Sequence, residues 1–155
     1  MNPDIFREYD IRGLVDADLD RETVRAIGRG YGSAIAEGGG SVVAVGMDVR
    51  LSSPALAAAL IDGITAAGVD VRALGVVPTP AVYFAVHQDE LDGAVQVTGS
   101  HNPVEFNGFK MMKGTASFYG QDIQALRARL EKGDFRSGRG RVVERDIRAE
   151  YLAAM

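Results

Sequence analysis

The polar residues best suited to chemistry lie at 98–103, where Thr-Gly-Ser-His-Asn-Pro directly follows an apolar stretch. In open α/β sheets, ligands collect beyond the carboxyl ends of strands, so this position favours a binding or catalytic loop. Gly99 allows the backbone to bring Ser100 into an exposed and strained position, and Asn102-Pro103 fixes the turn that follows. Ser100 is therefore the best candidate nucleophile. An ordinary capping turn uses the same residue types, and that alternative stays open at this point.

Basic side chains lie in two further segments. Residues 7–13, Arg-Glu-Tyr-Asp-Ile-Arg-Gly, place two guanidinium groups, a phenol and two carboxylates next to a glycine. Residues 48–50, Asp-Val-Arg, again place a carboxylate and a guanidinium group close together, after an earlier predicted strand. Such groups suit the binding of phosphate, although a surface cluster of salt bridges would account for either segment alone. A further cation, Lys110, ends the Asn-Gly-Phe-Lys segment at 107–110 that follows the serine loop. Together these segments predict a local positive cleft that is built from Arg7, Arg12, Arg50 and Lys110.

Two familiar patterns are misleading in this chain. The Gly-Arg-Gly-Tyr-Gly run at 28–32 resembles a dinucleotide-binding loop, but it lies within an amphipathic helix and follows no strand, so it indicates helix packing. Ser100 beside His101 suggests a serine hydrolase, yet the G-x-S-x-G elbow is absent, and adjacent side chains rarely point at each other. His87 is expected to be a surface residue near the end of a helix.

The elements that must position these residues follow from apolar periodicity, which alternates between helix-like and strand-like segments. Helices are predicted at 21–37, 54–67, 80–88 and 122–131, with Asp20, Ser53 and Thr79 as the N-caps of the first three. Strands are predicted at 42–46, 69–74 and 92–98, with a return at 109–112 that adds an antiparallel edge. Helical crossovers between successive strands predict an α/β fold, a three-layer αβα domain around a mixed, mostly parallel sheet of about four strands. Residues 148–155 read as a short helix.

Length and composition exclude several classes of protein and of functional site. The 155 residues are 46% hydrophobic and 25% charged, and a chain of this length folds as one domain without disulfides or a structural metal. The net charge of −4 argues against a general nucleic-acid surface, and no run approaches the roughly 18 apolar residues of a membrane span. The absence of cysteine removes thiol nucleophiles and zinc ribbons. A cytoplasmic location is the expectation.

Five motifs, in this order and spacing, resemble those of the α-D-phosphohexomutases, and specifically the bacterial phosphomannomutase/phosphoglucomutase branch. They lie at 6–13, 45–52, 77–80, 98–103 and 107–110. The resemblance implies that Ser100 is the phosphoserine that exchanges its phosphoryl group with the 1- and 6-positions of glucose or mannose phosphates through a hexose 1,6-bisphosphate. It also implies that Lys110 and Arg12 assist proton transfer and stabilise charge at the reacting hydroxyl. Phosphoryl transfer depends mainly on positioning and positive charge, which agrees with these residue types.

The same resemblance implies supporting roles for other residues. His101 and Asn102 shape the serine loop, His101 as a catalytic residue and Asn102 as a substrate-binding one. Arg7 and Tyr9 line the cleft near the substrate, and one phosphoserine oxygen on Ser100 binds Mg²⁺.

Members of the family have four domains, of which this chain resembles only the first. Residues 1–146 are expected to form the serine-bearing domain, and 147–155 to begin the segment toward a second domain that supplies the remaining Mg²⁺ ligands. Domains 2–4 of the same chain are therefore expected partners. Met47 and Val49 stand where the family usually has Arg and Gly. The isolated domain is expected to be nearly inactive, because it cannot exclude water around a sugar. A non-catalytic sugar-phosphate-binding or folding-model module is the alternative.

Overall fold

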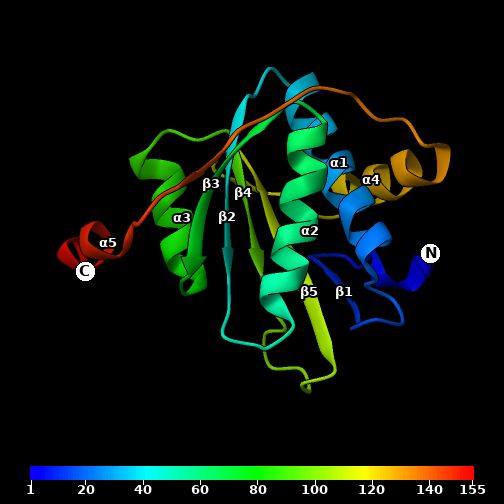
Figure 1. Cartoon of the computed structure of the whole chain (residues 1–155), viewed down its shortest axis with the longest axis horizontal. Coiled ribbons are helices and arrows are strands. Elements are labelled where there is room, and N and C mark those ends of the chain that lie inside the picture. Colours follow the sequence, from blue (N-terminus) through cyan, green and yellow to red (C-terminus); the bar gives the residue numbers. More distant parts are fainter.

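A seven-stranded sheet lies between two layers of helices in the computed structural model, which describes residues 1–155 (Figure 1). The predicted three-layer αβα class is therefore confirmed. The strands are β1 (Ile11–Leu14), β2 (Val42–Met47), β3 (Asp70–Val76), β4 (Gly93–Val97), β5 (Phe106–Lys113), β6 (Ala116–Ser117) and β7 (Val142–Glu144). The helices are α1 (Arg21–Glu37), α2 (Ser53–Ala66), α3 (Thr79–Gln88), α4 (Gln121–Lys132) and α5 (Arg148–Ala154), and a short 3-10 helix precedes β1 (Pro3–Ile5).

The sheet has the order β1-β5-β4-β2-β3-β7, with β6 paired to β5. It is mixed, as predicted, but it has seven strands rather than about four, and three of its six strand pairings are antiparallel. Three strands escaped the prediction because β1, β6 and β7 are only two to four residues long and carry too little apolar alternation to be recognised. The predicted return at 109–112 is β5, but it is an interior strand, since β1 pairs along its outer side.

Helices α1 and α2 pack very closely on one face of the sheet. A Cβ on Gly28 would overlap the backbone carbonyl of Leu60, and a Cβ on Gly63 would overlap that of Arg25. Only glycine permits backbones to approach this closely. The glycine run at 28–32 therefore serves helix packing, as predicted, and not dinucleotide binding.

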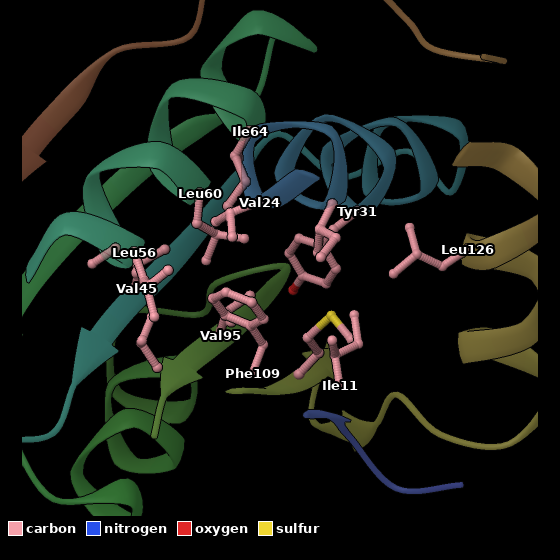
Figure 2. Packing of buried hydrophobic residues seen from close by; sticks show 14 of the residues in the cluster. Ile11, Val24, Tyr31, Val45, Leu56, Leu60, Ile64, Val95, Phe109 and Leu126 are labelled. Carbon is pink, nitrogen blue, oxygen red and sulfur yellow. The ribbon is translucent and has the colours of Figure 1, made fainter. Parts of the chain in front are cut away.

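Two hydrophobic clusters of different size hold the layers together. The larger has 24 buried residues and joins α1, α2 and α4 to the sheet, with Tyr31 and Phe109 near its centre (Figure 2). The smaller has 11 buried residues and joins α3 to the opposite face of β2, β3 and β4, with Met112 as its one member on β5. Helix α3 contacts β2 and β4, so the same face of β5 and β1 is left with little helical cover. His87 lies in the last turn of α3 and is exposed, as predicted.

The chain after α4 crosses the molecule to α3 (orange to red in Figure 1). There Arg145 forms ion pairs with Asp89, at 2.8 Å, and with Glu150, at 2.7 Å. Helix α5 confirms the helix predicted at 148–155, and Tyr151 packs edge-on against Phe84. The division of the chain into residues 1–146 and 147–155 stays a prediction. None of the helices is long and apolar enough to cross a membrane.

Candidate active site

Ser100 lies in the loop that leaves the carboxyl end of β4 and returns as β5. Its backbone is left-handed, with φ of +52°, which is costly for a residue that has a Cβ. The side chain is half-buried, and the Ser100 N–H donates to Thr98 Oγ1 at 3.0 Å. The strained conformation predicted from Gly99 and the turn residues is therefore confirmed, but the predicted exposed position is not, because Ser100 is half-buried. Strain of this kind in a loop at the carboxyl edge of a sheet is typical of functional sites.

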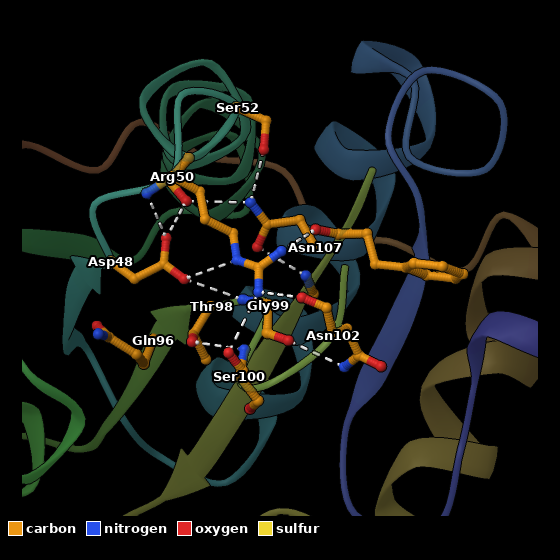
Figure 3. A network of polar contacts seen from close by, with 12 residues as sticks. Asp48, Arg50, Ser52, Gln96, Thr98, Gly99, Ser100, Asn102 and Asn107 are labelled. Carbon is orange, nitrogen blue, oxygen red and sulfur yellow. Dashed lines mark hydrogen bonds and ion pairs between the residues drawn. The ribbon is translucent and has the colours of Figure 1, made fainter. Parts of the chain in front are cut away.

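Asp48, just after β2, anchors the beginning of this loop (Figure 3). One carboxylate oxygen accepts a hydrogen bond from the Gly99 N–H at 3.0 Å, and the other accepts from the Ser53 hydroxyl and the Arg50 N–H. Burial disfavours the charged carboxylate, but the hydrogen bonds from Ser53, Gly99, Arg50 and Thr98 outweigh it and hold the pKa of Asp48 below its ordinary value. Asp48 therefore stays ionised near neutral pH and ties β2 to the serine loop.

Arg50 does not lie where the predicted phosphate cleft requires it. Its side chain is only 16% exposed, and the guanidinium points into the serine loop, where it donates to backbone carbonyl oxygens (Figure 3). The prediction failed because the carbonyls that bind Arg50 lie about fifty residues further along the chain, and local sequence gives no sign that they converge. Of the four cations predicted to line the cleft, Arg7, Arg12 and Lys110 remain candidates.

Asn102 and His101, the next residues of the loop, differ in whether their side chains make hydrogen bonds within the chain. Asn102 Nδ2 donates to the Gly99 carbonyl at 2.9 Å, so its amide closes the turn. His101 is exposed, and its ring makes no hydrogen bond within the chain. These positions agree with the role in shaping the loop that the resemblance implies for Asn102, while contact of either residue with substrate stays a prediction.

Lys110 and Arg12 share one face of the sheet. Phe109 belongs to the larger cluster, so strand alternation directs Lys110 to the opposite, α3-side face. Arg12 lies directly opposite Gly108 in the β1–β5 pairing, and residues opposite each other point to the same side. The structure therefore brings these two cations together on the poorly covered part of the sheet, next to the strand that leads into the Ser100 loop.

Arg12 is held there by a carboxylate partner. Its Nη2 atom lies 2.6 Å from Asp10 Oδ2, and the side chains of Arg12 and Asp10 are 26% and 11% exposed. This pair orients the guanidinium and leaves its other donors available. Lys110 is half-buried and has no ion-pair partner within the chain. Two cations with unused donors suit the binding of an anion.

Arg7 and Tyr9 lie further from the loop, in the exposed turn before β1. Tyr9 stacks on Tyr119, with ring centroids 6.0 Å apart and planes at 18°. Arg7 makes no side-chain hydrogen bond within the chain. The first residue of β1, Ile11, pairs with Phe109, so this turn lies at the Lys110 end of the open face rather than beside Ser100. A role in lining the cleft stays a prediction for both residues.

Mg²⁺ finds no complete set of ligands within this chain. No group of three or more His, Asp or Glu side chains converges anywhere in the structure, and Asp48, the carboxylate that binds the loop backbone, already accepts from Gly99, Ser53 and Arg50. Six oxygen ligands are the norm for this ion. The residues present therefore do not by themselves make a magnesium site.

The sequence did not predict the role of Asn107, which supports the serine loop through Ser52 and Ser53. Asn107 is fully buried, and its amide donates to the hydroxyls of Ser52 at 2.8 Å and Ser53 at 3.0 Å (Figure 3). The local signal was a polar residue at the second position of a largely apolar strand, within the 107–110 motif, since buried polar groups need partners.

The fold and the site together define an αβα domain with a braced serine loop at the carboxyl edge of its sheet. The family model described as phosphoglucomutase/phosphomannomutase, alpha/beta/alpha domain I, matches residues 3–137. The chain belongs to this family and corresponds to its domain I.

Known proteins agree with this assignment. A phosphomannomutase/phosphoglucomutase of Pseudomonas aeruginosa is 46% identical over 148 residues, and a phosphoglucomutase of Neisseria meningitidis is 42% identical over 151 residues. Each match covers 96% of this chain but only 32% and 33% of the relative. The crystal structure of a phosphoglucomutase/phosphomannomutase family protein from Burkholderia thailandensis superposes with a TM-score of 0.94 at 42% identity, over 98% of this chain and 35% of that protein. The chain therefore spans about one third of the length of its relatives.

Proposed function

We propose that this chain is the serine-bearing domain of a phosphohexomutase, and that Ser100 carries the phosphoryl group. The observation that carries this proposal is the left-handed Ser100, held in a braced loop beside a sheet face that presents Arg12 and Lys110. The substrates are glucose or mannose phosphates, by analogy with the relatives named phosphomannomutase and phosphoglucomutase.

The transfer has two halves that are chemically alike. A hydroxyl oxygen of the hexose phosphate attacks the phosphorus of phosphoserine, the bond from phosphorus to Ser100 Oγ breaks, and a hexose 1,6-bisphosphate forms. Lys110 takes the hydroxyl proton, and a proton is returned to Ser100 Oγ. Arg12 offsets the charge on the transferring oxygens. The bisphosphate then reverses its orientation relative to Ser100 and returns its other phosphoryl group to the serine.

Turnover depends on parts of the protein that this chain does not contain. The chain spans about one third of its relatives, and the open face carries no groups that would close over a sugar. Mg²⁺, where bound, would supply charge neutralisation at the phosphoserine, with Ser100 contributing one phosphate oxygen and the absent domain the rest. A cytoplasmic location remains part of the proposal. We therefore expect the chain alone to accept a phosphoryl group slowly and to show almost no mutase turnover.

The test is to incubate the chain with glucose 1,6-bisphosphate and Mg²⁺ and to measure its intact mass. One added phosphate is expected, located at Ser100 by peptide mapping and abolished in Ser100→Ala. Ser117→Ala removes another exposed serine, on β6, and is the matched control. Labelling that persists in Ser100→Ala, or rapid mutase turnover by this chain alone, contradicts the proposal.

The alternative function is a non-catalytic sugar-phosphate-binding module, which binding without phosphorylation would favour. In that case glucose 6-phosphate binds, Arg12→Ala weakens the binding, and Ser100 is never phosphorylated. Titration calorimetry beside the mass measurement separates the two functions.

A further inference from the structure

We propose that Arg50 is a positioning residue for Ser100, which holds the loop at 99–106 in the shape that presents the serine and does not itself contact phosphate. This inference rests on the proposed function of Ser100. It assigns to Arg50 a role different from that of the cations on the open face.

All four terminal N–H groups of the Arg50 guanidinium have partners within the chain. Nη1 and Nη2 donate to four backbone carbonyls, and Nε faces a carboxylate. These contacts are Pro103 O at 2.7 Å, Phe106 O at 3.0 Å, Ser100 O at 3.2 Å, Asn102 O at 2.6 Å and Asp48 Oδ2 at 3.5 Å. An arginine has five N–H groups and no acceptor. The four on Nη1 and Nη2 are taken by carbonyls, and the fifth, on Nε, lies beside the Asp48 carboxylate, which would repel a phosphate oxygen.

The loop needs a cation at this position. Four carbonyl oxygens that converge on one point repel each other unless a donor lies between them, and charge-assisted hydrogen bonds are the strongest available. One of the four belongs to Ser100, whose left-handed backbone is disfavoured on its own. Arg50 therefore acts directly on the strained residue and on the turn that follows it.

Shape matters here as well as charge. A planar guanidinium reaches two pairs of carbonyls at once, which the single ammonium of lysine cannot do. Residue 99 is part of the same arrangement, because a Cβ on Gly99 would overlap the Arg50 guanidinium. Gly99→Ala consequently keeps the charge of Arg50 but displaces it from the carbonyls.

The experiment compares Arg50→Ala, Arg50→Lys and Gly99→Ala with Arg127→Ala, which removes an exposed arginine paired only to Glu131 on α4. Hydrogen exchange is measured at the Asn102 and Phe106 amides, which donate within the loop to Gly99 O and Pro103 O. We expect exchange to accelerate by about tenfold or more in the first three variants, and to stay within about twofold in Arg127→Ala. Protection that is unchanged in Arg50→Ala, or fully retained in Arg50→Lys, overturns the proposal.

A second measurement distinguishes positioning from phosphate binding. With glucose 1,6-bisphosphate, the maximum rate of Ser100 phosphorylation is expected to fall about tenfold or more in Arg50→Lys and Gly99→Ala, while the half-saturating concentration changes less than about twofold. A raised half-saturating concentration at an unchanged maximum rate would mean that Arg50 binds phosphate, and would refute its role as a brace. If the wild-type chain takes up no phosphate, the proposed function fails, and the exchange measurement still decides whether Arg50 holds the loop.

Discussion

The two faces of the sheet differ in how completely they are covered. On one face α1, α2 and α4 bury a continuous cluster of 24 residues that reaches from β3 to β1. On the other, α3 covers β2, β4 and part of β3 with 11 residues, and leaves Arg12 on β1 and Lys110 on β5 without a helix above them. The covered face contributes most of the buried core, whereas the half-covered face presents the two cations to which we assign the proposed chemistry. On that proposal, most of the stability and the chemistry belong to opposite faces of a single sheet.

The sharpest test of this contrast uses two neighbours on β5. Phe109 points into the larger cluster and is fully buried, whereas Lys110 points to the open face. We expect Phe109→Ala to lower the free energy of unfolding by about 3–5 kcal/mol, and Lys110→Ala to change it by less than about 0.5 kcal/mol. Urea unfolding followed by circular dichroism measures both. A loss in Lys110→Ala comparable to that in Phe109→Ala would show that the two faces are equally important for folding.

A smaller effect is expected where α1 and α2 touch on the covered face. The added methyl of Gly28→Ala would meet the Leu60 backbone carbonyl, which cannot move aside, so we expect a loss of about 1–3 kcal/mol. Gly30→Ala, on the same helix, would meet only the flexible ends of Leu126 and Leu130, and the higher helix propensity of alanine offsets that contact by about 1 kcal/mol. Thermal unfolding of the two variants should therefore differ clearly. Equal destabilisation would contradict close backbone packing at Gly28.

The smallest effect on global stability is expected at the loop beside the open face, through the pKa of Asp48. Because this pKa is lowered in the folded chain, the ionised carboxylate stabilises the loop above its ordinary value of 3.8, and the stabilisation is lost as the pH falls through the lower, folded value. We expect a loss of at most about 1 kcal/mol of global stability, with a local release of the Gly99 N–H.

An NMR titration of the Gly99 amide signal between neutral and acid pH measures this release. Asp48→Asn removes the titrating group and serves as the control, so its Gly99 signal should lack the acid transition. A Gly99 signal in the wild-type chain that does not change below the ordinary aspartate pKa would show that Asp48 does not hold the loop.

Local sequence was sufficient for much of the fold. The helix predicted at 80–88 corresponds to α3, which begins one residue earlier, at Thr79, because a proline at its start and apolar spacing along it act within one element. The strained Ser100 followed from a glycine and an Asn-Pro turn within four residues. The missing strands are those whose identity depends on a partner: β1 becomes a strand because β5 is there to pair with it.

What the sequence determined by itself is the alternation of helices and strands, the identity of the candidate nucleophile, and the cations available near it. Only the tertiary structure decided how those cations are used. Arg12 and Lys110 face the same side because β1 pairs with β5 in one register, and Arg50 turns inward because four carbonyls about fifty residues away converge on it. The physical reason is that strand register and hydrogen bonding act between distant segments, whereas the patterns readable in a sequence act between neighbours.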